Sequence, residues 1–107
     1  EVIGVMTSLN KKAKQIFGRY EIHACTDVTG FGLAGHSLEL AKGSGVTVEI
    51  DGAGLPLQTA ACEYAKMGLI PEGAYKNRAY AGQDTEVKQR SGCRIFSLIP
   101  RPPEACL

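Results

Sequence analysis

Residues 23–36 read His23-Ala24-Cys25-Thr26-Asp27-Val28-Thr29-Gly30-Phe31-Gly32-Leu33-Ala34-Gly35-His36, and they give the first indication of the fold. The pattern predicts a short apolar strand, a glycine-rich bend and a helix in direct succession. Gly30 and Gly32 can take a positive φ and let the backbone approach a ligand closely. The helix that follows presents unpaired N–H groups and the positive end of its dipole. Such a bend suits phosphate, and the Asp27 carboxylate beside it suits Mg²⁺.

A purely structural interpretation of the same residues stands beside this one. Strand-to-helix turns with glycines and an aspartate are common in α/β proteins, and most of them bind nothing. A single carboxylate is also too few ligands for a dedicated cation cage. From the residues alone, Asp27 is a candidate metal ligand, and Gly30 and Gly32 are weak candidates for a place near a phosphate. No residue is predicted to be catalytic.

The size and charge of the chain limit the classes of function. The chain has 107 residues, with 12 Lys and Arg against 11 Asp and Glu, which gives a net charge of +1. This length predicts one domain with one modest core. So small a net charge predicts no recruitment of nucleic acid or of an anionic membrane. The sequence contains no apolar run of the ~18 residues that could span a bilayer and no signal-peptide pattern, so a cytoplasmic location is expected.

Hydrophobic periodicity predicts the elements of the first half of the chain. An apolar stripe at steps of three and four predicts one amphipathic helix over residues 2–17 that packs through this stripe. A short buried strand is expected over 22–26, and a helix over 33–41 closed by Gly43. Alternation over 46–50 predicts a strand with one buried face. The fold class is therefore α+β, with a small mixed or antiparallel sheet packed with helices.

The second half begins with the loop 51–54. Pro56 is expected at the first position of a further helix, which Gly68 ends. Residues 69–73 are predicted to be a non-helical connection that leads to Asn77, an amide interpreted as a turn former.

The remaining chemically active side chains have mainly structural interpretations. Four cysteines, Cys25, Cys62, Cys93 and Cys106, form no C-x-x-C pair, so free thiols are expected. Cys25 is expected to be a small buried strand residue rather than a nucleophile.

Two further aspartates and the two histidines complete the candidates. Asp51 and Asp84 are candidates for a second carboxylate, although Asp51 precedes a glycine as turn residues do. His23 and His36 lack the spacing of a metal pair, and each can be a structural histidine.

Several runs of the sequence resemble selenophosphate synthetase, also called selenide, water dikinase. The resemblance rests on Ala24 to Leu33 with Gly35-His36, and on Leu38 to Ala41, Gly45-Val46, and Ala65 to Ala74 with Asn77. It covers about residues 1–82 and is similar to the start of the family's C-terminal, aminoimidazole-ribonucleotide-synthetase-like domain. The resemblance places His36 at a helix-packing position.

The resemblance implies an ATP-dependent phosphorylation of selenide that yields selenophosphate, AMP and orthophosphate. In the family, the aspartate of the Thr-Asp-Val-Thr-Gly-Phe-Gly motif is a Mg²⁺ ligand, and this role maps onto Asp27. ATP and selenide are the implied substrates and a homodimer the implied assembly. The N-terminal half, which carries most of the metal-binding aspartates and the reactive cysteine or selenocysteine with its lysine, is expected to be missing, and the isolated chain is expected to be inactive.

Two alternatives remain open. The chain could be a non-catalytic structural or interaction domain in which the motif survives as structure only. It could also belong to another ATP-dependent member of the superfamily, which includes aminoimidazole ribonucleotide synthetase, thiamine-monophosphate kinase and a hydrogenase maturation factor. The run from Cys25 to Gly35 favours the selenium enzyme.

The tail differs from the family. Residues 1–92 form the expected partial domain, incomplete at its C-terminus, and residues 93–107 lack the family motif Asp-Pro-Gln-Thr-Ser-Gly-Gly-Leu-Leu. Plausible codons for this tail, translated from the third base of the first codon, encode that motif whole. We therefore expect a frame-shifted tail. Its prolines, Pro100, Pro102 and Pro103, cannot donate to a central strand, so the tail is expected to pack loosely or at the periphery.

Overall fold

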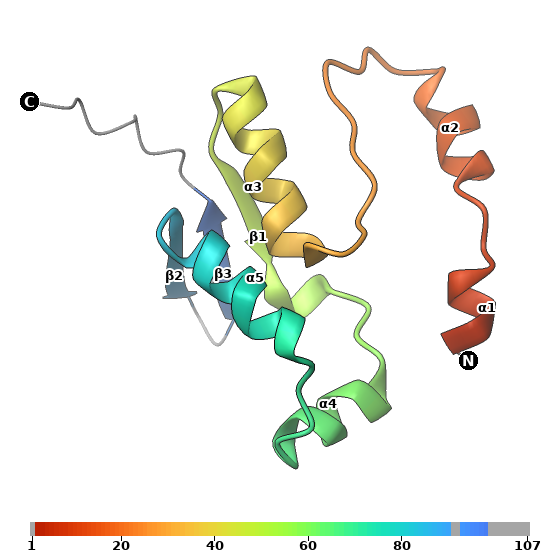
Figure 1. The fold of residues 1–107 in the computed structure, drawn as a ribbon. Coiled ribbons are helices and arrows are strands. Elements are labelled where there is room, and N and C mark those ends of the chain that lie inside the picture. Colours follow the sequence, from red (N-terminus) through yellow and green to blue (C-terminus); the bar gives the residue numbers. More distant parts are fainter. Residues whose placement is uncertain (1, 91–92, 99–107) are drawn as a thin grey trace, which may run out of the picture.

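The computed structural model describes residues 2–90 and 93–98 as an α+β arrangement (Figure 1). The predicted α+β class is therefore confirmed. The elements in chain order are α1 (Val2–Met6), α2 (Lys11–Phe17), α3 (Gly32–Ser44), β1 (Val48–Asp51), the 3₁₀ helix η1 (Gly52–Gly54), α4 (Thr59–Lys66), α5 (Glu72–Gly82), β2 (Thr85–Arg90) and β3 (Cys93–Leu98).

The described strands form one antiparallel sheet in the order β1-β3-β2. Ile50 of β1 and Val87 of β2 both pair with position 96 of β3. The strand expected over 46–50 is confirmed in type, because Val48 and Ile50 are half-buried and alternate with exposed neighbours. Residues 93–98, expected at the periphery, instead form the central strand. The prolines of the tail lie outside the described residues.

Helices α3 and α5 lie side by side in front of the sheet and form the core with it (Figure 1). Leu38 of α3 is fully buried and packs with Ala81 of α5, and Val48 and Ile50 of β1 pack against this pair. Burial of a leucine side chain contributes about 1.5–3 kcal/mol, so Leu38 is a main anchor of α3 on the sheet. The core therefore rests on a few residues and places the start of α3 beside α5.

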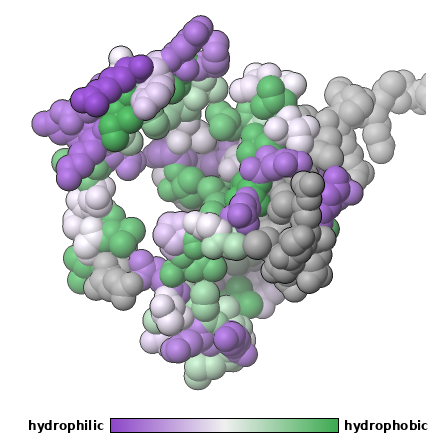
Figure 2. Space-filling model, turned by 180° about the vertical axis from the view of Figure 1, so that it is seen from behind, coloured by the Kyte–Doolittle hydropathy of each residue, from purple (hydrophilic) through white to green (hydrophobic). Residues whose placement is uncertain are grey.

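The N-terminal segment differs from its prediction. Two helices, α1 and α2, replace the single helix expected over 2–17, and the apolar stripe is not packed: Ile3, Met6 and Leu9 are 77%, 78% and 79% exposed. In Figure 2, hydrophobic side chains lie at the surface among hydrophilic ones where α1 and α2 are. Helices this short gain their stability from packing, so without a covered face the polar residues Thr7, Ser8 and Asn10 interrupt the helix.

The strand expected over residues 22–26 is also absent, because these residues belong to no helix or strand of the described chain. Cys25 is exposed there, and the prediction of a buried strand residue was wrong. A short apolar run does not identify a strand without a partner edge, and the sheet pairs its described strands elsewhere.

Helix ends are set by glycine and proline, though not always at the expected residue. α3 runs past Gly43 and ends at Gly45, whose φ of 65° is left-handed. Gly68, with a φ of 81°, follows α4 as predicted. Pro56 was expected at a first helical position, but α4 begins later, at Thr59. The favourable φ of proline permits a helix start without requiring one.

The non-helical connection predicted over 69–73 is shorter than expected. It ends at Pro71, because α5 begins at Glu72 and includes Asn77. Pro71 precedes the helix with a φ of −59°, which prepares the backbone for a helical turn. Glu72 lies in the first turn, where a negative charge is favourable, and pairs with Lys76 at 2.8 Å. Asn77 therefore sits on a helix beside α3.

Candidate functional site

The glycine-rich bend lies immediately before α3. The N–H of Gly32 donates to the carbonyl of Thr29 at 3.0 Å, and Gly32 has a φ of 69°. A side chain at Gly32 would be strained by this left-handed φ, so glycine is required there. Gly30 has no positive φ, but a Cβ built on it meets nothing within 4 Å. The bend therefore leaves open space beside Gly30, at the start of a helix of 13 residues.

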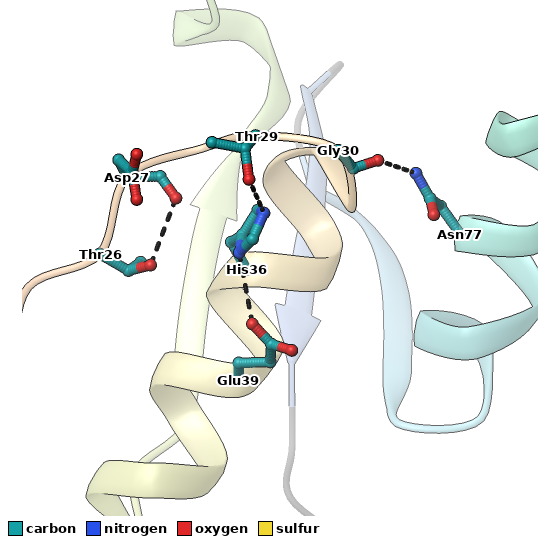
Figure 3. A network of polar contacts seen from close by, with 7 residues as sticks. All are labelled: Thr26, Asp27, Thr29, Gly30, His36, Glu39 and Asn77. Carbon is teal, nitrogen blue, oxygen red and sulfur yellow. Dashed lines mark hydrogen bonds and ion pairs between the residues drawn. The ribbon is translucent and has the colours of Figure 1, made fainter.

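Asp27 is exposed in the segment that leads to this bend. Its carbonyl oxygen accepts a hydrogen bond from the Thr26 hydroxyl at 3.2 Å, and Figure 3 shows its side chain pointing away from α3. Within the described part of the chain, no group of three or more His, Cys, Asp or Glu side chains could hold a metal. Mg²⁺ often takes one or two carboxylates and fills its other positions with water and phosphate oxygens. The exposed Asp27 carboxylate could supply one ligand to a cation, but the described residues around it do not form a complete cage.

His36 ties the bend to α3. Its Nε2 lies 3.0 Å from the Thr29 hydroxyl oxygen, and its Nδ1 lies 3.3 Å from a carboxylate oxygen of Glu39 (Figure 3). A carboxylate can only accept, so in the neutral imidazole the proton sits on Nδ1, and Nε2 accepts from Thr29. His36 is only 9% exposed. The structural interpretation of this histidine agrees with the geometry, and its two polar contacts were not predicted.

Asn77 ties the same bend to α5. Its side-chain N–H donates to the carbonyl of Gly30 at 2.9 Å, across 47 residues of sequence (Figure 3). The interpretation of Asn77 as a turn former was wrong, since the residue lies in a helix. No local sequence signal could have revealed this contact, because it depends on how α3 and α5 pack.

Aromatic residues pack beside the contacts of the bend. The ring of Phe31 lies 5.5 Å from that of His36 and 6.1 Å from that of Tyr80 on α5. Gly35 lets Phe31 approach α3, because a Cβ built on Gly35 would lie 2.8 Å from the Phe31 Cβ. The bend is thus seated on both helices by packing as well as by hydrogen bonds.

The two other aspartates considered as metal ligands have different roles. The carboxylate of Asp51 accepts from the N–H of Ala53 at 2.9 Å and caps η1, so the turn interpretation of Asp51 is confirmed. Asp84 pairs with Lys42 of α3 at 2.7 Å. This hydrogen bond raises the pKa of Lys42 above its usual value. Among the described residues, neither carboxylate joins Asp27 in a group of three or more potential metal ligands.

A shallow pocket of about 530 Å³ lies between residues 23–26 and the second half of α3. His23, Cys25, Glu39 and Ser44 contribute to its lining, whereas Asp27 and Gly30 do not. His23 is exposed, with its Nε2 3.8 Å from Glu21. The pocket is therefore separate from the bend, which remains the candidate site. Cys25 and Cys62 are free thiols, as expected for these two.

Comparison with known proteins gives the family. Residues 3–82 match the family described as AIR synthase related protein, C-terminal domain. The chain belongs to this family. The matched residues include the glycine-rich bend and the helices α3 and α5 that hold it. No solved structure gives a significant match.

Relatives named selenide, water dikinase are similar to this chain. The protein from Clostridium botulinum (strain Eklund 17B / Type B) is 55% identical over 80 residues, which is 75% of this chain and 23% of the relative. The protein from Clostridioides difficile is 47% identical over 87 residues, or 81% and 25%. The protein from Pelobacter propionicus is 49% identical over 101 residues, or 94% and 29%. The chain spans about a quarter of the length of these curated relatives.

No helix in the described part of the chain is long and apolar enough to cross a membrane.

Proposed function

We propose that this chain is a segment of a selenide, water dikinase that contributes Asp27 to a Mg²⁺–ATP site shared with the rest of the enzyme. The observation that carries the proposal is the position of Asp27. It is an exposed carboxylate directly before a glycine bend with open space at Gly30, in a domain whose relatives bear that enzyme name. One carboxylate is a sufficient contribution when phosphates and other residues complete the coordination.

The proposed reaction converts selenide, ATP and water into selenophosphate, AMP and orthophosphate, so it breaks both phosphoanhydride bonds of ATP. Bound Mg²⁺ would neutralise charge on the phosphates. In this chain, Asp27 would hold one cation, and the bend would let backbone approach the phosphates. The chain's contribution is therefore positioning and charge. Selenide activation would come from the rest of the enzyme.

The exposed apolar stripe on α1 and the segment that follows it supports a shared site. Ile3, Met6 and Leu9 are large apolar residues left in solvent, and an exposed apolar surface commonly marks an interaction site. We propose that the N-terminal half of the enzyme covers this stripe, in a homodimeric assembly in the cytoplasm, with no nucleic acid or membrane partner.

The test replaces the matching segment of the Clostridium botulinum relative with this chain's residues 3–82. In this chimeric dikinase, Asp27→Asn should lower selenide-dependent AMP release by at least the ~10–100-fold that loss of an outer partner of a metal ligand costs, because Asp27 would bind the cation directly. The unfolding midpoint should stay near that of the parent chimera, because the Asp27 side chain is exposed. Asp51→Asn is the matched control and should leave turnover unchanged.

An Asp27→Asn chimera that keeps full turnover would refute the metal role. If Asp27→Asn instead unfolds the protein, the alternative of a non-catalytic structural domain gains support. AMP or ADP formation that depends on another acceptor, but not on selenide, would favour a different ATP-dependent superfamily member.

A further inference from the structure

We propose that His36 and Asn77 are positioning residues that fix the Thr29-Gly30 segment and thereby set the direction of the Asp27 carboxylate. This inference rests on the proposed function of Asp27. It assigns the two contacts a role in the site rather than in the core alone.

The segment that carries Asp27 lacks secondary structure of its own. Residues 23–29 belong to no helix or strand of the described chain. A segment with no hydrogen-bond ladder takes its geometry from the groups that hold its ends. Its C-terminal end is held at Thr29 by His36 and at Gly30 by Asn77.

The two contacts come from different helices and act on adjacent residues. His36 lies on α3 and Asn77 on α5, and these helices are packed together through Leu38 and Ala81. The bend is therefore fixed in the frame of the core by two independent points. One point alone would allow rotation about the contact, whereas two adjacent points restrict it.

The geometry of His36 is itself restricted. The ring is nearly buried, Glu39 holds its Nδ1, and Phe31 lies against it. A buried imidazole needs partners for both nitrogens, and each has one here. His36 is therefore held in place on α3 by Glu39 and in turn holds Thr29, which lies two residues after Asp27.

Residues that do not bind the metal themselves still affect a metal site when they orient one of its ligands. Loss of an outer partner typically costs about 10–100-fold in metal affinity or activity. Since successive residues of an extended segment are ~3.3–3.6 Å apart, a displacement of Thr29 is passed on to Asp27 within two residues. The expected effect of losing either contact is a weaker Mg²⁺–ATP site in a folded domain.

The first experiment uses the protein itself without metal or nucleotide. Long-range nitrogen spectra of the neutral His36 imidazole should show the proton on Nδ1 rather than on Nε2. Asn77→Ala and His36→Phe should shift the amide signals of Gly30 and Gly32, because each removes a contact to the bend. The matched controls Asn10→Ala and His23→Phe should leave those signals in place, since Asn10 makes no side-chain cap and His23 is exposed.

The second experiment measures KM for Mg²⁺–ATP and kcat in the chimeric dikinase. His36→Phe keeps the ring but loses both nitrogens, and Asn77→Ala loses the donor. Each should raise KM or lower kcat on the order of 10-fold with a retained unfolding transition. His36→Gln places an acceptor near the Nε2 position and should restore most of the loss. Thr29→Val should mimic His36→Phe, and the double variant should be no worse than either single one.

The outcomes separate this inference from the function on which it rests. If Asp27→Asn lowers turnover while His36→Phe and Asn77→Ala match the parent, the positioning role is wrong and the proposed function stands. If Asp27→Asn retains full turnover, both fail. If His36→Phe is as active as His36→Gln, the histidine only fills space, and its positioning role is refuted.

Discussion

The contact between Gly35 and Phe31 gives a sharp test of packing at the scale of single residues. Gly35→Ala would place a Cβ 2.8 Å from the Phe31 Cβ, and both groups are attached directly to backbone. Overpacking of this kind costs about 1–3 kcal/mol, more than the ~1 kcal/mol that alanine gains over glycine in a helix. We expect Gly35→Ala to lower the free energy of unfolding, measured by urea denaturation.

Gly43 is the matched control for this substitution. It lies in the same helix, is exposed, and has nothing within 4 Å of a built Cβ. Gly43→Ala should therefore raise the stability by about 0.5–1 kcal/mol. If both alanines stabilise the protein equally, the close approach of Phe31 to α3 is not present in solution.

At the scale of elements, the Lys42–Asp84 pair links α3 to the residues that follow α5. The hydrogen bond with Asp84 raises the pKa of Lys42 above 10.5, so the charged lysine is favoured in the folded state. A raised folded-state pKa adds stability that is fully present below pH 10.5 and is lost as the pH rises through the folded value. The pair should therefore stabilise the protein at neutral pH and stop doing so in strong alkali.

The measurement compares unfolding midpoints of the parent and Lys42→Met from neutral pH to above pH 10.5. Lys42→Met should be less stable at neutral pH, and the difference should shrink as the pH rises. Lys76→Met is the control, because the Lys76–Glu72 pair is largely exposed and such pairs contribute little. A difference between parent and Lys42→Met that is constant over the whole range would contradict the assigned linkage.

The elements that the sequence predicted best are those whose pattern agrees with local packing. The helix near 33–41 follows from a hydrophobic face that is buried in the structure, and the strand near 46–50 follows from one that is half-buried. The prediction of one helix over 2–17 was wrong. Its apolar face is exposed, so no packing against the core stabilises a continuous helix there. Asp27 was identified from its neighbours, whereas Asn77 could not be, because its contact joins α5 to a bend 47 residues away. The role of Asp27 as a metal ligand stays a prediction.

At the scale of the whole molecule, the origin of residues 93–107 can be tested in the gene. We propose that this tail is a frame-shifted form of the family's C-terminal motif. Residues 93–98 supply the central strand through backbone pairing, and backbone pairing depends less on side-chain identity than core packing does. The DNA over this region should encode Asp-Pro-Gln-Thr-Ser-Gly-Gly in a shifted frame. A base sequence that cannot encode the motif in either shifted frame would rule the proposal out.

The proposed division of the site between this chain and the rest of the enzyme predicts how the isolated chain behaves. Asp27 belongs to no described group of three or more potential ligands, and one carboxylate cannot offset the cost of dehydrating Mg²⁺. We expect the purified chain of 107 residues to bind Mg²⁺–ATP only weakly and to release no selenide-dependent AMP. Calorimetric titration and an AMP assay with selenide measure the two properties directly. Micromolar Mg²⁺–ATP affinity, or AMP released only when selenide is present, would show that the chain contains a complete site.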